Sequence, residues 1–87
     1  MLENTYYIQD QLKEKVVTAW ENCLTRVLRE FLQREPTLED AKKCTLYSRE
    51  GELDVKYLTY NGTRLGKIVT DIRPPIGSVT FYPETGC

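Results

Sequence analysis

Tyrosine, apolar and cationic side chains fall on one side of the strands expected after residue 44, and this mixture is suited to binding rather than to catalysis. Tyrosine buries a large area at a low cost in side-chain entropy while its hydroxyl stays polar, so it is favoured in protein interfaces. The solvated face of an antiparallel sheet is mostly polar, and apolar residues on it indicate a surface that meets a partner. The residues predicted to bind that partner are Tyr47, Leu58, Tyr60, Asn61, Arg64, Leu65, Lys67 and Val69.

Two other interpretations of this surface stay open. Scattered apolar side chains are normal on protein surfaces, and a short helix predicted below could cover some of them. Alternatively, Tyr47 and Tyr60 beside Lys56 and Lys67 could stack the bases of a single-stranded nucleic acid. The charge balance argues against nucleic acid, because 13 acidic residues outnumber 12 basic ones and no basic block occurs.

Catalytic groups are scarce in this sequence. The chain has no histidine, the commonest general base and metal ligand. Cys23 lies on an apolar helical stripe and Cys44 at the inward start of a strand, so both thiols are expected in the core. Asp54 and Asp71 could form a carboxylate pair, but lysines expected between them favour a cross-strand charge ladder. We therefore predict no enzyme activity, no cofactor and no metal site.

Length and cysteine usage bound the class of protein. With 87 residues, the chain is expected to form one domain over residues 1–87. It shows no secretory apolar region and no run of the ~20 apolar residues that a membrane span requires. The three cysteines, Cys23, Cys44 and Cys87, are odd in number and far apart, which favours free thiols. A cytoplasmic protein without membrane contact is the expectation.

The elements that must position these residues begin with a helix. Apolar side chains recur every three or four residues, at Ile8, Leu12, Val16, Trp20, Cys23, Val27 and Phe31. This spacing predicts an amphipathic helix over residues 5–34. The helix should end before Pro36, because the residue before a proline avoids the α conformation. Thr37 followed by Asp40 predicts a capped second helix over residues 38–43.

From residue 44 the period changes to two and predicts a series of strands. They span residues 44–49, 52–60, 63–73 and 78–82. Tight turns are expected at Glu50-Gly51 and Asn61-Gly62, and Pro74-Pro75 should separate the last two strands.

If both turns are tight, the register follows by counting. Tyr57 then lies opposite both Cys44 and Gly66, and Val55 lies opposite Ile68. One face collects Cys44, Leu46, Leu53, Val55, Tyr57, Ile68 and Ile72. The predicted fold class is α+β, in which both helices pack on this face of a four-stranded antiparallel β-meander.

These elements favour a small non-catalytic protein-binding module, an inhibitor or adaptor of the kind that phages and mobile elements encode, acting by surface occlusion. A homodimer is also expected, because a helix over residues 5–34 would span about 45 Å whereas strands of eight residues span only about 26 Å. The alternative is a helix broken near Gln9–Gln11, with Tyr6, Tyr7 and Ile8 folding back.

Overall fold

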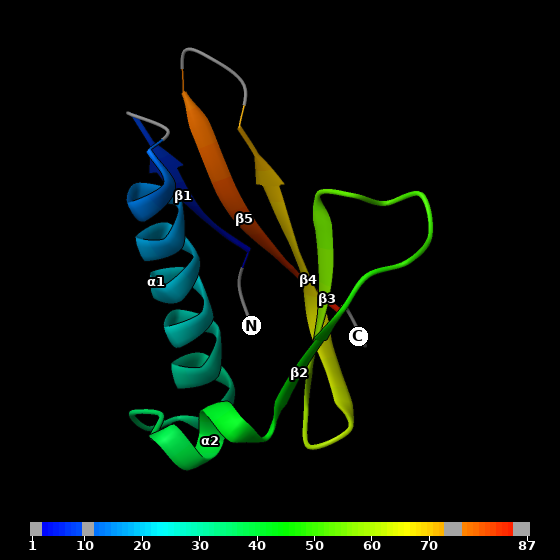
Figure 1. Ribbon diagram of the computed structural model, residues 1–87. Helices are drawn as coiled ribbons and strands as arrows, with labels where there is room; N and C mark the ends of the chain where they lie inside the picture. The colour runs from blue at the N-terminus through cyan, green and yellow to red at the C-terminus, as the bar shows by residue number, and fades with distance from the viewer. Residues whose placement is uncertain (1–2, 10–11, 73–75, 85–87) are drawn as a thin grey trace.

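The computed structural model describes residues 3–9, 12–72 and 76–84 as one antiparallel sheet with two helices (Figure 1). The elements are β1 (Asn4–Ile8), α1 (Lys13–Leu32), α2 (Leu38–Lys42), β2 (Cys44–Tyr47), β3 (Val55–Tyr60), β4 (Thr63–Asp71) and β5 (Gly77–Pro83). The strand order is β1-β5-β4-β3-β2. The α+β class, the long helix and the short helix are confirmed, but the sheet has five strands rather than four.

The additional strand, β1, comes from the segment that helical periodicity assigned to the start of the long helix. Asn4–Ile8 is rich in aromatic and β-branched residues, which favour a strand. It pairs with β5 so that Tyr6 lies opposite Val79 and Ile8 opposite Gly77. The prediction of one helix over residues 5–34 is therefore wrong, and the alternative in which residues 6–8 fold back is correct.

The shorter helix changes the argument about oligomeric state. α1 has 20 residues and so spans about 30 Å, close to the length of the sheet that it covers. The helix does not extend beyond the sheet as a helix over residues 5–34 would. The length difference that led us to expect a homodimer is therefore absent. Neither helix in the described part of the chain has an apolar stretch long enough to cross a bilayer.

Local signals explain where the helices end. α1 stops at Gln33, which adopts a left-handed conformation with φ 60° and donates its backbone N–H to the carbonyl of Arg29. α2 begins with the predicted capping box, in which Thr37 and Asp40 each accept the other's backbone N–H. The predicted second helix, residues 38–43, is correct to within one residue.

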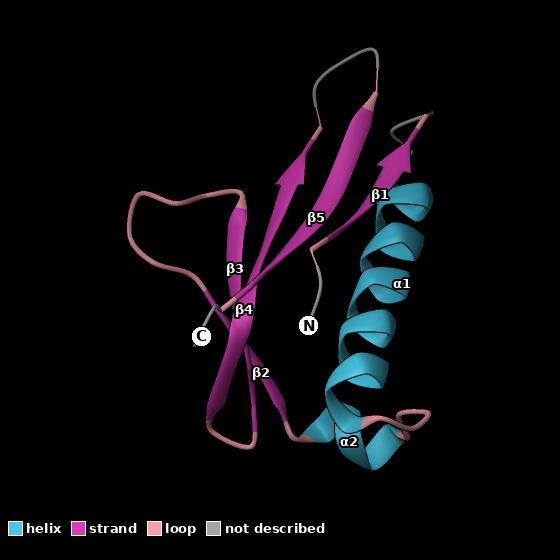
Figure 2. Ribbon diagram, turned by 180° about the vertical axis from the view of Figure 1, so that it is seen from behind, coloured by secondary structure: helices cyan, strands magenta, loops and turns pink. Residues whose placement is uncertain are grey.

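The core lies between α1 and one face of the sheet (Figures 1 and 2). Its buried apolar members are Ile8, Ala19, Cys23, Val27, Leu28, Leu58, Leu65, Ile68, Val79 and Phe81. Trp20 packs against them and donates its indole N–H to the Thr70 hydroxyl at 2.9 Å, which ties α1 to β4. In the described part of the chain, the side of the sheet away from α1 carries no helix, and the connection over residues 48–54 projects on that side (Figure 1).

A β-bulge in β4 overturns the predicted register between β3 and β4. The Asn61-Gly62 turn is confirmed, since Tyr60 lies opposite Thr63, but the register shifts by one residue between Leu58 and Thr59. Beyond the shift, Leu58 lies opposite Gly66. Because side chains alternate between the two faces, a shift of one residue exchanges the faces of the strand.

Gly66 is required at the bulge. Its φ of +156° is unfavourable for other residues, and a Cβ there would lie 2.3 Å from the backbone oxygen of Tyr82 and 2.8 Å from the ring of Phe81. The extra residue, Leu65, turns into the core and is 2% exposed.

The predicted register between β2 and β3 is also wrong, because the connection is longer than a two-residue turn. A turn does form, with the Glu52 N–H donating to the Arg49 carbonyl, but the strands end at Tyr47 and resume at Val55. Cys44 therefore lies opposite Tyr60 instead of Tyr57. The shift is three residues, an odd number, so it too exchanges the faces of the sheet.

These shifts redistribute the residues predicted to face inward. Ile68 is in the core, and Cys44 packs half-buried against it. Leu46 shares their side of the sheet but remains 41% exposed. The prediction is wrong for Val55, Leu53, Tyr57 and Ile72, which lie on the opposite face of the sheet or are exposed at strand ends and loops. Three predicted features lie outside the described residues. They are the end of the third strand at Arg73, the break at Pro74-Pro75 and the free thiol of Cys87.

Candidate functional site

The sheet face opposite α1 is the candidate site, and we call it the open face. Its outward positions follow from the strand pairing and alternate with those of the core. Its aromatic, cationic and apolar members are Tyr7, Tyr47, Val55, Tyr57, Arg64, Lys67, Val69 and Tyr82. Four of the six tyrosines of the chain therefore lie on one face.

A stacked tyrosine pair lies at the β2 end of the open face. The rings of Tyr47 and Tyr57 lie opposite each other on β2 and β3, with centroids 5.3 Å apart and planes inclined by 20°. The Arg49 guanidinium lies 4.2 Å from the Tyr57 ring centroid. Glu52 accepts a hydrogen bond from the Tyr57 hydroxyl at 3.0 Å. Burial, and next this bond to a carboxylate, raise the pKa of Tyr57 above its ordinary value, so the phenol stays protonated.

Arg64 connects the tyrosine pair to the end of β5. Its guanidinium donates to the Tyr47 hydroxyl at 3.3 Å and to Glu84 Oε1 at 3.0 Å. It also lies 5.8 Å from the ring centroid of Tyr57, within the range of a cation–π contact. Arg64 can occupy this position because it precedes the bulge and therefore shares the face of Thr59.

Tyr82 and Lys67 extend the same surface toward β5. They lie directly opposite each other, and the Lys67 ammonium is 5.7 Å from the Tyr82 ring centroid. The Tyr82 side chain keeps 38% of its surface exposed, and Tyr47 keeps 36%. Both rings therefore offer a large apolar area and a polar hydroxyl to a partner.

The structure brings together only part of the predicted binding set. Tyr47, Arg64, Lys67 and Val69 lie on the open face, and Asn61 is exposed at the hairpin turn. The prediction is wrong for the remaining three. Leu58 and Leu65 are 0% and 2% exposed in the core, and Tyr60 packs on the helix side of the sheet.

Tyr60 belongs instead to a buried polar cluster between the helices and the sheet. Its hydroxyl donates to Asp40 Oδ1 at 3.0 Å, and its ring lies 5.6 Å from that of Phe31. Asp40 is 2% exposed and also accepts two hydrogen bonds from Arg34, at 2.7 and 3.0 Å. The Arg34 guanidinium, and next the backbone N–H of Thr37, hold the pKa of the Asp40 carboxyl well below its usual range. Both oxygens of this carboxylate accept hydrogen bonds. The cluster therefore has a structural role: it connects the segment after α1 with α2 and β3.

Sequence reasoning missed Tyr57 as a member of the open face and Arg49 as its neighbour. It left open whether Tyr82 or Phe81 lies on this face, and the register of β5 places Tyr82 there. The two tyrosines depended on register, and the signal that could have corrected it was present: an isolated glycine inside a strand pattern indicates a bulge. Gly66 is such a residue, and a bulge there reverses the face of Tyr57. Arg49 comes from the loop, whose path no periodicity describes.

Groups with catalytic potential are few in the described part of the chain, although Asp54 and Asp71 line a common pocket. Among the described residues, no three histidine, cysteine, aspartate or glutamate side chains could hold a metal ion. Burial raises the pKa of the Cys23 thiol to about 11 and raises that of Cys44, so both thiols stay protonated. The predicted charge ladder is wrong, because Lys56 lies opposite Ile68 on the helix side of the sheet while Lys67 is on the open face.

The chain matches no family model, no curated protein and no solved structure. The chemistry of the open face must therefore carry any interpretation of function.

Proposed function

We propose that the protein is a small binding module, an inhibitor or adaptor, that holds a folded protein partner on the open face. The observation that carries the proposal is the cluster of Tyr47, Tyr57, Arg64 and Tyr82 on a sheet face that neither described helix covers. Tyrosine and arginine are enriched among the residues that dominate binding energy in protein interfaces. Occlusion of a partner's surface requires only such a face, without catalytic groups.

Preorganisation of the cluster supports this function. Tyr47 is held by stacking on Tyr57 and by its bond from Arg64, and Arg64 is in turn held by Glu84. A side chain that is already fixed in the free protein loses little conformational entropy when a partner binds. The cluster also sits on paired strands rather than on a loop, which keeps its geometry defined.

A protein partner fits these contacts better than single-stranded nucleic acid. A base needs an aromatic ring with a free face and cations that are available to phosphates. Tyr57 is only 7% exposed, with Tyr47 stacked on it and Arg49 lying over its ring. The Arg64 guanidinium already forms an ion pair with Glu84. Tyr60 and Lys56, which the nucleic-acid interpretation also needed, lie on the other side of the sheet.

Quantitative affinity capture with matched variants tests the proposal. The bait is the tagged protein expressed in the cells that make it, compared with Tyr47→Ala/Tyr82→Ala and with a control, Leu38→Ser. Leu38 is an apolar residue on α2 that is 73% exposed and does not belong to the open face. A true partner should be depleted at least about tenfold from the tyrosine variant, the loss expected when an interface residue worth more than 1.4 kcal/mol is removed.

Three outcomes decide between the interpretations. Loss from the tyrosine variant with retention by Leu38→Ser supports the open face as the binding surface. Equal capture by all three baits refutes it. Binding of the purified protein to a single-stranded oligonucleotide, weakening steeply with salt, would favour the nucleic-acid alternative instead.

A further inference from the structure

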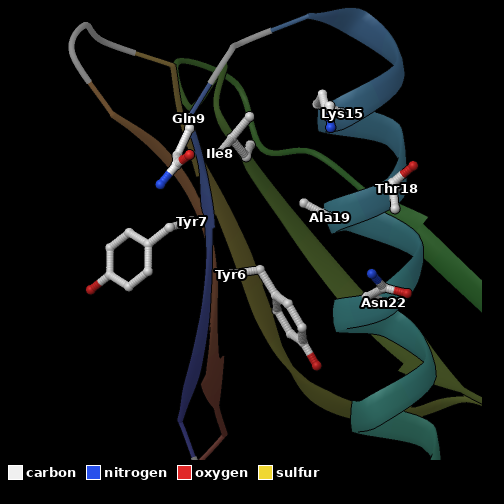
Figure 3. A pocket seen from close by; sticks show the side chains of 8 residues that line it. All are labelled: Tyr6, Tyr7, Ile8, Gln9, Lys15, Thr18, Ala19 and Asn22. Carbon is white, nitrogen blue, oxygen red and sulfur yellow. The ribbon is translucent and has the colours of Figure 1, made fainter.

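A second surface lies on the other side of the molecule, between the edge strand β1 and the helix α1 (Figure 3). It is an open cleft of about 300 Å³, which we call the β1–α1 cleft. Its walls are formed by Tyr6, Ile8 and Gln9 from the strand side and by Lys15, Thr18 and Asn22 from the helix. Tyr7 of the open face also borders the cleft, but its side chain points away from α1 (Figure 3), and the six wall residues do not belong to the open face, so the cleft is a separate candidate site.

The strand wall of the cleft is an edge that pairs with no other described strand. β1 is the outermost strand of the described sheet, and only its β5 side is paired. N–H and C=O groups of alternate residues on the other edge are therefore left for another strand or for water. Native proteins commonly protect such an edge with a proline, a lysine or a bulge. Asn4–Ile8 contains no proline or lysine, and its pairing with β5 runs without a shift.

The helix wall supplies two exposed polar side chains, Lys15 and Asn22, beside Thr18, whose hydroxyl already donates to the Glu14 carbonyl. Lys15, Thr18 and Asn22 are three and four residues apart, so they share one face of α1. Within the described chain, the side chains of Gln9, Lys15 and Asn22 make no hydrogen bond or ion pair. One end of the cleft is bounded by the Tyr6 hydroxyl, which is hydrogen-bonded to the Arg26 guanidinium.

We propose that the β1–α1 cleft takes an extended segment of another protein, which pairs with β1 as a sixth strand and carries an acidic side chain toward Lys15. Peptides that add to a sheet edge gain affinity from main-chain hydrogen bonds and specificity from pockets beside the strand. Both parts are present here. The lining residues include one cation and no acid, which selects for a segment of negative charge.

A second copy of this chain fits the cleft less well. A twofold axis between two β1 strands would bring the same helix face of each copy together. That face carries Lys15, Asn22 and Arg26, so the two copies would meet with polar side chains and like charges. Self-association through β1 is nevertheless a distinct outcome of the test below.

The experiment uses a displayed library of random linear peptides, panned against the intact protein. Selected peptides are synthesised, their affinity is measured by fluorescence anisotropy, and the protected amides are located by hydrogen exchange. The test variant is Asn22→Trp, which fills the cleft from an exposed helix position. The control is Glu21→Trp, at the next exposed position, which does not line the cleft.

The proposal predicts acidic peptides that slow amide exchange in β1. Asn22→Trp should weaken them at least about tenfold and Glu21→Trp should not, because only the first removes the space beside the strand. Lys15→Ala should weaken them by about two- to fivefold, as expected for one exposed ion pair.

Three results would overturn the proposal. The first is a panning that yields no peptide with protection at β1, and the second is equal binding by both tryptophan variants. The third is concentration-dependent protection of β1 without any peptide, which would assign the edge to a second copy of the chain.

Discussion

Replacement of Gly66 by alanine should be among the most damaging single changes in this protein. Gly66 holds the bulge that turns Leu65 inward and places Tyr57 and Lys67 on the open face. An added Cβ would meet the backbone oxygen of Tyr82 at 2.3 Å and two ring carbons of Phe81 at 2.8 Å. The first of these contacts cannot be relieved by rotating a side chain, so strands β4 and β5 would have to separate.

The expected loss follows from two separate effects. A residue with a side chain at the φ of Gly66, +156°, costs about 1–3 kcal/mol in backbone strain. Forcing a methyl group into a packed site costs a further ~1–3 kcal/mol. The total of about 2–6 kcal/mol is a large part of the ~4–13 kcal/mol expected for a chain of this length. Urea titration followed by the fluorescence of Trp20 measures the free energy of unfolding of each variant.

Gly51→Ala is the matched control. Gly51 also has a positive φ, +86°, but no atom lies within 4 Å of its hypothetical Cβ. It should therefore show the backbone strain without the clash, leaving a difference of about 1–3 kcal/mol between the two variants. The cost of Phe81→Leu should also be smaller in the Gly66→Ala background than in the native protein, because the leucine relieves part of the clash. Equal destabilisation by Gly66→Ala and Gly51→Ala would refute the bulge and the assignment of the open face.

Three further predictions test the core and the buried polar groups. Leu58→Ala should destabilise the fold by about 2–5 kcal/mol, whereas Leu53→Ala, at a site that is 91% exposed, should change stability by less than about 0.5 kcal/mol; similar effects in urea titrations would contradict the corrected faces. Because the folded pKa of Asp40 is lowered, its contribution to stability should be present above the unfolded pKa of about 3.9 and be lost as the pH falls below that value. Asp40→Asn should flatten this part of the stability curve, and an unchanged acid limb would show that Asp40 is not held as described. Burial raises the pKa of the Cys23 thiol to about 11. In a Cys44→Ser/Cys87→Ser variant, Cys23 should therefore react with a thiol reagent near pH 8 only as fast as the protein unfolds. Immediate labelling of the native protein would disprove the burial of Cys23.

Local signals in the sequence were sufficient to predict several elements of the structure. Asn61-Gly62 supplies the backbone conformation of a two-residue hairpin, and the hairpin forms there. Thr37 and Asp40 are spaced for a capping box, and α2 begins with one. These features depend on residues a few positions apart, so they can be read without knowledge of the tertiary fold.

The open face could not be read in the same way, because it depends on register. The tight-turn assumption at Glu50-Gly51 and the unbroken strand through Gly66 each moved side chains to the wrong face. The prediction therefore places Leu58 and Leu65 on the surface, although they are in the core. An apolar side chain in a strand has the same period on either face, and only the bulge and the loop decide between them.

Long-range contacts account for the remaining differences. Asn4–Ile8 becomes a strand because β5, more than sixty residues later, offers it an edge. Asp40 signals only a helix cap in the sequence, yet Arg34 and Tyr60 also converge on its carboxylate. Neither partner lies at a spacing that a local pattern would connect to Asp40.

The most direct test of the account is site-specific photo-cross-linking from the open face. A benzophenone side chain is placed at Tyr82 in one variant and at Leu38 in another, and each is irradiated in the cells that make the protein. Both positions are exposed, but only Tyr82 lies on the open face. The account predicts a covalent adduct with one defined protein from position 82 and none with that protein from position 38. The same adduct from both positions, or an adduct from position 38 alone, would contradict it.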